Sequence, residues 1–398
     1  MSATCVSTDL LQTLLSSLER EVPAAISLRE RLHANPEPSN AEHGTAHLVA
    51  EAIDASDVEP VAGTGLIASA GSTGVQAVAV RAELDALPIT EKTGAPFAAG
   101  NGFMHACGHD VHMAALAALF RAARRSESSL ARPLLALFQP SEESYPSGAE
   151  VISRGRTLAA DVGAIVAAHV HPDVPWGCVS VEPGPVNASC DYLRITVEGA
   201  GGHGAYPHRA RDPILALSHV VVALQSLVSR RLDPMHPGVF SVGWTRAGSA
   251  ENVIPETAEA GGTLRALEPG DRAPLREAAR EIAVATARAH GCAARVEITE
   301  GEPATVNDAT LAAAARALLP EAGFELARPM RSCGSDDFGF YGRLGATLMV
   351  FVGLDDAPGT GRFPLHHPRF LPPSEAVEAV ARAQAVALAA ALAASPTS

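Results

Sequence analysis

The sequence has few of the features that mark nucleic-acid-binding, disordered or membrane proteins. Aromatic residues make up 4% of the 398 residues and charged residues 19%, whereas 47% are hydrophobic, which is typical of a globular chain. The formal net charge of −14 argues against nucleic acid as a partner, because nucleic-acid binding favours basic stripes. No apolar run approaches the roughly 20 residues that span a bilayer, so no membrane partner is expected either.

The cysteines are not spaced as a disulfide framework. The six lie far apart, at positions 5, 107, 178, 190, 292 and 333. The N-terminal residues 1–15 lack the basic region and small-residue cleavage site that are typical of a signal peptide. We therefore expect a reducing, cytoplasmic location.

Apolar runs and helical patterns alternate along the first part of the chain. Residues 8–34 have helical periodicity, which Pro23 is expected to reset by opening a second helix. Four runs resemble buried strands: residues 65–69, 77–80, 134–138 and 164–168. The alternation predicts an α/β fold with a mixed, mostly parallel sheet flanked by helices.

The pattern changes after about residue 186. The order strand, helix, strand, strand, helix, strand follows within residues 187–302, which is typical of a ferredoxin-like α+β unit. The α/β pattern then resumes, with a strongly apolar strand at 346–352. The sequence therefore predicts a discontinuous domain, residues 1–186 and 303–398, with a smaller domain, residues 187–302, inserted into it.

Residues 104–110, Met-His-Ala-Cys-Gly-His-Asp, concentrate side chains that bind metals, and another histidine follows at position 112. Such a stretch has little use in an apolar core, because buried imidazoles and carboxylates must be paired. A helix N-terminus capped by Asp110 is the alternative interpretation. The combination of Cys107, His109, Asp110 and a further histidine within six positions favours a metal site.

Three further polar fragments each follow a predicted core strand. They are Glu142 and Glu143 after residues 134–138, His169 and His171 after 164–168, and His366 and His367 after 346–352. Each alone is also typical of a surface loop. Ligand and catalytic groups gather at the carboxyl ends of strands in open α/β sheets. Together the fragments supply thiolate, imidazole and carboxylate, the ligand set of zinc and related divalent ions.

With these residues the chain resembles the dinuclear metal amidohydrolases, which include hippurate hydrolase, bacterial aminoacylases and plant indole-acetyl-amino-acid hydrolases. Carboxypeptidase G and succinyl-diaminopimelate desuccinylase are relatives. The resemblance covers residues 29–37, 81–89, 104–110, 139–143, 169, 201–208, 252–255, 262–265, 335–338 and 365–368. It implies a zinc-peptidase-like catalytic domain, with the inserted domain as a lid through which a homodimer forms.

The resemblance also implies a role for each candidate residue. Two divalent ions, Zn²⁺ or Mn²⁺ with Co²⁺ and Ni²⁺ as further candidates, would be held by Cys107, His109, Glu143, His169 and His366. Cys107 would bridge them, and Glu142 would be the general base. His203, Asn252 and Arg265 would contact the oxyanion and the α-carboxylate of the substrate, and one of these groups can come from a partner subunit.

The chain departs from the family pattern at a few positions. Glu83 stands where aspartate is usual, and Asp336 where glutamate is usual. His171 and His367 add imidazoles beside two implied ligands, so the choice within 169/171 and within 366/367 stays open.

The resemblance implies an enzyme that hydrolyses the amide bond of N-acyl amino acids, releasing a carboxylic acid and a free amino acid. A dipeptidase or carboxypeptidase with the same dinuclear mechanism is the alternative, although Cys107 in place of a bridging aspartate favours the amidohydrolase. A third interpretation is an inactive ligand-binding module. It would require a lost base or ligand, and Glu142 and all the implied ligands are present.

Overall fold

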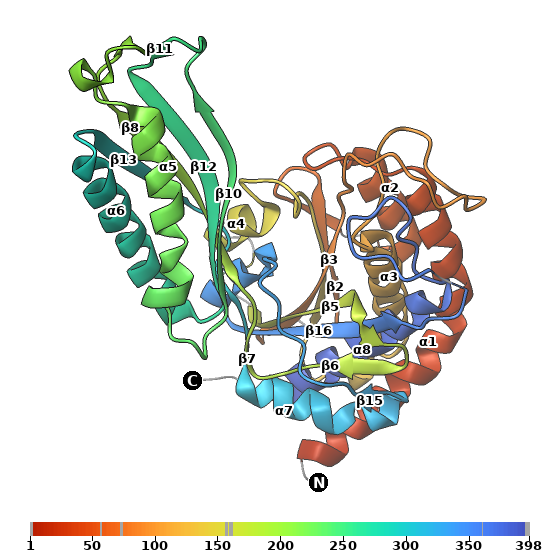
Figure 1. Cartoon of the computed structure of the whole chain (residues 1–398). Coiled ribbons are helices and arrows are strands. Elements are labelled where there is room, and N and C mark those ends of the chain that lie inside the picture. The colour runs from red at the N-terminus through yellow and green to blue at the C-terminus, as the bar shows by residue number, and fades with distance from the viewer. Residues whose placement is uncertain are drawn as a thin grey trace. The chain divides into compact units, whose positions relative to one another are not determined.

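The computed structural model describes residues 3–55, 58–71, 75–155, 158, 162–359 and 361–394. The chain folds into two compact units (Figure 1). The first unit comprises residues 1–184, 306–330 and 340–398, and the second comprises residues 185–305 and 331–339. The short strands β7 (Gly184–Asn187) and β14 (Thr305–Asn307) lie where the chain passes from one unit to the other.

The first unit is built on an eight-stranded sheet with the order β1-β2-β4-β3-β5-β16-β6-β15. The strands are β1 (Val58–Val61), β2 (Gly65–Ala70), β3 (Ala77–Glu83), β4 (Leu134–Gln139), β5 (Val162–Pro175), β6 (Cys178–Ser180), β15 (Glu325–Leu326) and β16 (Ala346–Asp355). The central strands β4, β3, β5 and β16 are parallel, whereas β1–β2, β2–β4 and β16–β6 are antiparallel pairs. The predicted mixed, mostly parallel sheet is therefore confirmed.

The central strands have continuous apolar runs because the sheet is buried on both faces. Every residue of β3 is buried, and so is nearly every residue of β16. Burial on both faces removes the period-two alternation that a half-exposed strand would show. This explains why these strands stand out in the sequence as short hydrophobic runs.

The helices of the first unit are α1 (Ala3–Ala34), α2 (His43–Ile53), α3 (His109–Arg125), α4 (Gly148–Arg154), α7 (Ala309–Leu318) and α8 (Glu375–Ala393). Helices α1, α3 and α8 pack against one another beside the sheet (Figure 1). The prediction that the first helix resets at Pro23 is wrong, because α1 runs through this residue. Buried Leu18 and Leu28 on either side of Pro23 hold the helix in the core, which offsets the backbone hydrogen bond lost at proline.

Among the described residues one helix, α8, is long and apolar enough to cross a membrane, with 19 residues and a mean hydropathy of 1.5. The prediction that no apolar run approaches this length is therefore wrong for α8. Within the unit, however, 78% of this stretch is buried, against α1, α3, α7 and the strands. A core helix that is surrounded on all sides needs no polar face.

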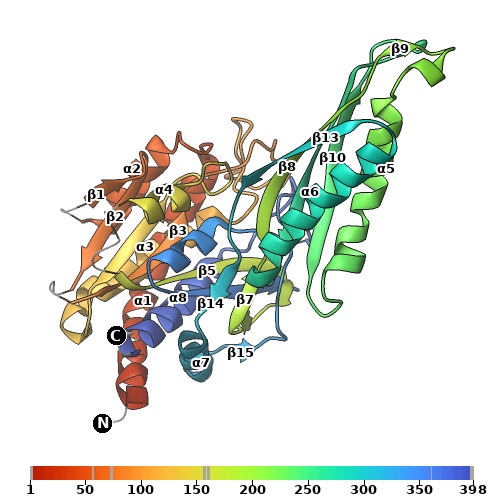
Figure 2. The same ribbon diagram turned by 90° about the vertical axis from the view of Figure 1, so that its left-hand side faces the viewer.

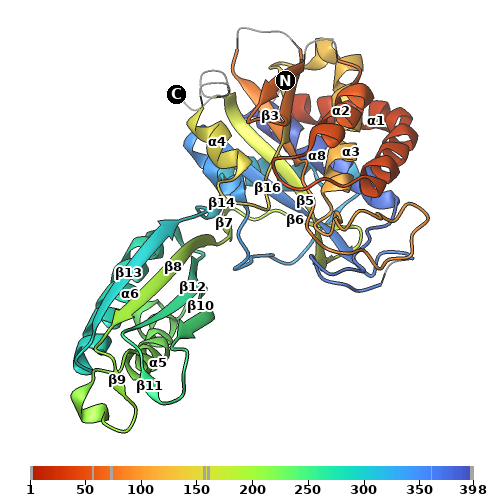
Figure 3. The ribbon, with the colours of Figure 1, turned by 90° about the horizontal axis from the view of Figure 1, so that it is seen from above.

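The second unit is a four-stranded antiparallel sheet with the order β10-β12-β8-β13. Its strands are β8 (Ser189–Glu198), β10 (Gly238–Ala247), β12 (Thr257–Ala266) and β13 (Ala293–Glu300), which follow one another across the sheet in Figure 3. Helices α5 (Pro213–Leu224) and α6 (Arg272–Ala289) lie side by side against it (Figure 2). Short strands β9 (Gly202–His203) and β11 (Val253–Ile254) form a separate pair. The ferredoxin-like order of elements is confirmed.

The segment 331–339 packs with the second unit, although the sequence pattern placed it in the discontinuous domain. The Ala188 N–H donates to the Ser332 carbonyl oxygen at 3.0 Å, and Arg265 Nη1 donates to the Cys333 carbonyl oxygen at 3.1 Å. These bonds join residues far apart in sequence, which no local pattern predicts. That the two units act as a catalytic domain and a lid stays a prediction.

Candidate metal and catalytic site

The Cys-Gly-His motif lies in the loop that leads into α3. Gly108 precedes the helix with a φ of +86°, a left-handed conformation that favours glycine. A Cβ at this position would lie 2.5 Å from Val170 Cγ2, so glycine also allows the loop to pack closely on β5. Cys107 and His109 flank the turn, and both are buried.

The loop lies at the point where the order of the sheet reverses. The chain passes from β3 to β4 on one side, whereas β5 and β16 lie on the other side of β3. Open α/β sheets bind ligands outside the carboxyl ends of their strands at such a switch point. Asp85 lies two residues beyond the end of β3, and His169 lies on β5.

Hydrogen bonds fix which nitrogen of His109 and of His169 carries a proton. His109 Nδ1 lies 2.8 Å from the Asp85 carbonyl oxygen, and His169 Nδ1 lies 2.7 Å from the Val170 carbonyl oxygen. A carbonyl only accepts, so each Nδ1 donates and each Nε2 has a lone pair in the neutral ring. His109 Nε2 is buried and has no hydrogen-bond partner among the residues that the structure describes, and His169 Nε2 lies 3.6 Å from Cys107 Sγ. In both rings, therefore, Nε2 is the nitrogen that is available to a metal.

Two carboxylates and a third imidazole approach from the loops after β4 and β16. The Glu143 N–H donates to Asp85 Oδ2 at 2.9 Å, which anchors the loop. Glu143 Oε1 lies 3.3 Å from His366 Nε2, and Glu142 Oε2 lies 3.9 Å from His109 Nε2. The two adjacent glutamates thus face different imidazoles.

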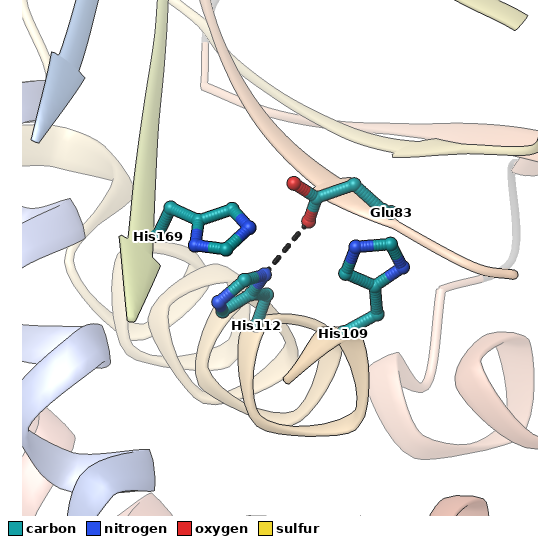
Figure 4. A group of neighbouring side chains, drawn as sticks. All are labelled: Glu83, His109, His112 and His169. Carbon is teal, nitrogen blue, oxygen red and sulfur yellow. Dashed lines mark hydrogen bonds and ion pairs between the residues drawn. The ribbon is translucent and has the colours of Figure 1, made fainter. Parts of the chain in front are cut away.

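In the first unit these side chains form three overlapping groups, within each of which the potential ligand atoms lie within 4.8 Å of one another. The groups are Glu83, His109, His112 and His169 (Figure 4); Cys107, Glu143 and His366; and His109, Glu142 and Glu143. His109 and Glu143 each belong to two groups, and Cys107 contacts His169. The structure therefore brings all five predicted metal ligands into one cluster, with the predicted base beside it. A thiol, a carboxylate and imidazoles with available lone pairs fit zinc and related divalent ions.

The two neighbouring histidines lie outside these groups. The His171 ring meets Phe351 edge-on at 5.8 Å, and the His367 ring stacks on Phe363 at 4.6 Å. Neither is part of a potential metal-binding group among the described residues. The geometry therefore favours the first histidine of each pair as the ligand.

Burial and neighbouring charges set the ionisation of the cluster. Burial alone would raise the pKa of Glu143. The interactions with His366 and His109 are stronger than this effect of burial, so the pKa of the carboxyl group is lowered. Burial lowers the pKa of His169 well below its usual range, and His112 adds to this effect. An ionised carboxylate and a neutral imidazole are the forms that bind metals.

Asp85 is a site residue that the sequence prediction missed. Its carbonyl oxygen accepts from His109, and its carboxylate accepts from the Glu143 N–H and, at 2.6 Å, from Ser39 Oγ. Asp85 therefore orients residues from two loops without being one of the five predicted ligands. The available signal was a buried strand followed at once by acidic residues.

A buried charged network lies behind the motif. Arg29 Nε and His33 Nδ1 both contact Asp110 Oδ2, at 2.7 and 2.8 Å, and His33 Nε2 lies 3.1 Å from Glu91 Oε1. Burial lowers the pKa of His33, but the two carboxylates outweigh it and raise the pKa to about 9. The network fixes Asp110, in the first turn of α3, next to His109. It gives a role to Arg29 and His33, which lie one helical turn apart in the family-like N-terminal segment.

The predicted catalytic residue His203 and the predicted substrate-binding residues Asn252 and Arg265 all belong to the second unit. His203 lies on β9, and the Gly204 N–H donates to the Asn252 carbonyl oxygen at 2.8 Å, so these two segments adjoin. The Ala205 N–H donates to His203 Nδ1 at 3.0 Å, which leaves the proton of the neutral ring on Nε2. His203 is thus prepared to donate a hydrogen bond.

The structure does not bring Arg265 to His203. Arg265 is the second-last residue of β12, whereas β11, which pairs with the His203 strand, ends at Ile254, close to the first residue of β12. At about 3.3 Å per residue, the strand separates the two ends by roughly 25 Å. Within one chain, therefore, the two residues cannot contact the same small substrate.

Comparison with known proteins agrees with this geometry. Residues 79–391 match the model of the Peptidase family M20/M25/M40. The chain is 34% identical over 361 residues to an N-acetyl-L-cysteine deacetylase of Bacillus subtilis, covering 89% of this chain and 84% of that protein. It is 33% identical over 360 residues to the IAA-amino acid hydrolase ILR1-like 4 of Arabidopsis thaliana, covering 87% and 80%.

A solved structure is similar along its whole length. It is that of the Bacillus subtilis YXEP protein, a dinuclear metal binding peptidase from the M20 family, with a TM-score of 0.80 and 30% sequence identity. The match covers 94% of this chain and 98% of that one. The chain therefore belongs to the peptidase family M20/M25/M40.

Proposed function

We propose that the protein is a metal-dependent amidohydrolase that cleaves N-acyl amino acids into a carboxylic acid and a free amino acid. The observation that carries this proposal is the cluster in which Cys107, His109 and Glu143 meet two further imidazoles, with Glu142 beside them. The relatives named for N-acetyl-L-cysteine and for IAA-amino acids support the substrate class.

The metal content of the proposed enzyme is two divalent ions, Zn²⁺ or Mn²⁺. The residues that would hold them are Cys107 as the bridge, with His109, Glu143, His169 and His366. Bound divalent ions would supply Lewis acidity, which makes water acidic near neutral pH and polarises a carbonyl group. The buried His109 Nε2, which has no hydrogen-bond partner, is the clearest sign that the site is built for such a group.

The side chains would divide the proton transfers and the recognition of the substrate among them. Glu142 accepts the proton of the attacking water and returns it to the leaving nitrogen, as general acid–base catalysis requires. His203 Nε2–H donates to the oxyanion as it forms. The guanidinium of Arg265 pairs with the substrate carboxylate, and Asn252 supports this binding.

Activity on a panel of substrates tests the proposal. N-acetyl, N-benzoyl and long-chain N-acyl amino acids should be hydrolysed after addition of Zn²⁺ or Mn²⁺, and chelation should abolish the activity. Dipeptides should be poor substrates. Preferred cleavage of dipeptides would instead support the dipeptidase alternative, and no hydrolysis of any substrate by protein with two bound ions would contradict the proposal.

Replacement of the proposed base is the sharpest mutational test. The Glu142→Gln protein should retain both ions and its fold but lose a factor of about 10²–10⁴ in kcat, because the amide cannot accept a proton. Metal content is measured alongside the kinetics. Glu59→Gln, an exposed position on β1, is the matched control and should behave as wild type. Near-wild-type turnover of Glu142→Gln would remove this residue from its proposed role.

We also propose a homodimer formed through the second unit. On α5, Leu215 and Val222 are 50% and 70% exposed, and Ile214 is 42% exposed. Strand β10 is an edge strand of the adjoining sheet, with unpaired backbone groups along one side. A second copy of the chain would cover this apolar face and edge. The separation of His203 from Arg265 supports an arrangement in which each chain supplies His203 to its partner's site.

A further inference from the structure

His112 has hydrogen-bond partners at both of its ring nitrogens, although it belongs to a potential metal-binding group (Figure 4). Its Nδ1 lies 2.9 Å from Glu83 Oε2, and the Val170 N–H donates to its Nε2 at 3.1 Å. A backbone N–H only donates, so Nε2 is an acceptor and Nδ1 carries the proton that Glu83 accepts. His112 is fully buried, and binding a metal through either nitrogen would break one of these bonds.

The other end of this connection is the predicted ligand His169. The peptide groups around Val170 are held at two points: the Val170 N–H by His112, and the Val170 carbonyl oxygen by His169 Nδ1. The pairing of β3 with β5 ends at Arg81 and Ala167, before Val170 is reached. His112 therefore supplies an acceptor on the β3 side of β5, beyond the end of the pairing with β3, whereas the pairing with β16 on the other side continues past Val170.

The acid that anchors His112 is itself fixed. Arg81 Nη1 donates to Glu83 Oε1, and Arg81 Nε donates to Gln139 Oε1 at 2.9 Å. Tyr341 donates to the same Gln139 oxygen at 2.8 Å. All of these side chains are buried, so the hydrogen bonds among them restrain the position of Glu83.

We infer that His112 is a positioning residue for His169 and not a metal ligand. Glu83 fixes the tautomer of His112, and His112 holds the Val170 N–H. The carbonyl group of the same residue, which lies in the following peptide group, holds His169 with the Nε2 lone pair toward Cys107. Partners of this kind orient metal-binding histidines, and their loss weakens metal binding by about 10- to 100-fold. The inference rests on the metal site proposed above.

The chain offers a matched control for the test. His105 lies in the loop that leads into α3 and is 1% exposed, but neither of its ring nitrogens has a hydrogen-bond partner among the described residues. His112→Phe and His105→Phe therefore make the same replacement at two buried positions, and only the first removes the connection to Val170. His112→Gln keeps a long side chain with an acceptor for the Val170 N–H, whereas the shorter His112→Asn does not reach it.

The first measurement uses metal-free, full-length protein labelled with ¹⁵N-histidine. Proton–nitrogen correlation spectra should show His169 as a single Nδ1–H tautomer in wild type and in His105→Phe. In His112→Phe this signature should change to that of a tautomer mixture, whereas His109 keeps its own tautomer because Asp85 holds it independently. An unchanged His169 tautomer would overturn the inference.

The second measurement is metal affinity by competition with a chromophoric chelator. His112→Phe should still bind two ions at saturation, one of them 10- to 100-fold more weakly than in His105→Phe. Loss of one ion at any concentration would identify His112 as a ligand, and equal affinities would refute its positioning role. If the His112→Phe protein does not fold, the other two variants provide the test. The His112→Gln protein should bind the metal at least 10-fold more tightly than the His112→Asn protein. Equal metal affinities of these two variants would refute the positioning role. Wild-type protein that binds no metal would refute the proposed function, while the tautomer measurement would still test this inference.

Discussion

His33 is fully buried between Asp110 and Glu91, and carboxylate oxygens face both of its nitrogens. Ionised carboxylates only accept hydrogen bonds, so the ring carries two protons and a positive charge. Burial opposes this charge, but the two carboxylates outweigh burial and raise the pKa of His33 from 6.5 to about 9. The charge state of one side chain is thereby linked to the folding of the first unit.

This linkage predicts how stability depends on pH. Below pH 6.5 the ring is protonated in both the folded and the unfolded chain, so its charge contributes its full stabilisation of the folded state. This contribution falls as the pH rises and is lost above pH 9. The difference between the pKa of His33 in the folded and in the unfolded chain corresponds to roughly 3 kcal/mol in the free energy of unfolding. The His33→Gln protein should therefore be destabilised most at pH 6. The difference in stability between this variant and wild type should become smaller toward pH 9.5.

Thermal unfolding with chelator present measures this difference without a contribution from metal binding. The control is His47→Gln, because His47 is 73% exposed and should show no such trend. A deficit in His33→Gln that stays constant across this pH range would show that the ring is not charged in the folded protein.

The turn before α3 depends on two separate properties of Gly108. Its φ is +86°, and an added Cβ would meet Val170 Cγ2 at 2.5 Å. Gly108→Ala should therefore push the loop away from β5, weaken metal binding at least 10-fold and lower the melting temperature. Gly102 has the same φ, but no atom lies within 4 Å of the position of its Cβ. Gly102→Ala should be destabilised only by the positive φ of the backbone. The difference in melting temperature between the two variants therefore measures the effect of the close contact with Val170. Equal decreases in melting temperature and in metal affinity for the two variants would mean that the contact with Val170 is unimportant.

The parts of the fold that follow from local patterns were predictable from the sequence. The runs that became β2, β3, β4 and β5 were visible because strands buried on both faces are continuously apolar. The order of elements in the second unit was visible because half-exposed strands alternate and helices have a longer period.

What the sequence did not predict depends on contacts between distant segments. Pro23 continues α1 because leucines on both sides of it are buried. Segment 331–339 joins the second unit through bonds to Ala188 and Arg265. In the site, the implied ligands gather as expected, but Asp85 and the partners of His112 are identified only by hydrogen bonds that no spacing in the sequence reveals.

The proposed dimer can be tested through the sites that its two chains would share. His203→Ala should lower kcat strongly while both ions remain bound, because its Nε2–H would act on the oxyanion and not on the metals. Mixing His203→Ala with Glu142→Gln protein should then restore activity, since a mixed dimer contains one site with both functional groups if His203 serves the partner's site.

Light scattering coupled to size-exclusion chromatography checks that dimers exist and exchange subunits. Val222→Glu, which places a charge on the exposed face of α5, should produce monomers and abolish the recovery. A lack of recovery despite proven exchange would mean that His203 acts within its own chain, and full activity of His203→Ala alone would remove it from the reaction.

The insertion of the second unit also has a consequence for how the chain is made. Strand β5 ends at Pro175, but β16, its parallel neighbour in the sheet, begins only at Ala346. At about 5–20 residues per second, a ribosome needs roughly ten to thirty seconds to synthesise the intervening chain. During that interval one edge of an apolar central strand has no neighbour, and α8, which later covers it, does not yet exist. We therefore expect the nascent chain to be most prone to aggregation during this interval, and His366 reaches the other predicted metal ligands only when this period is over.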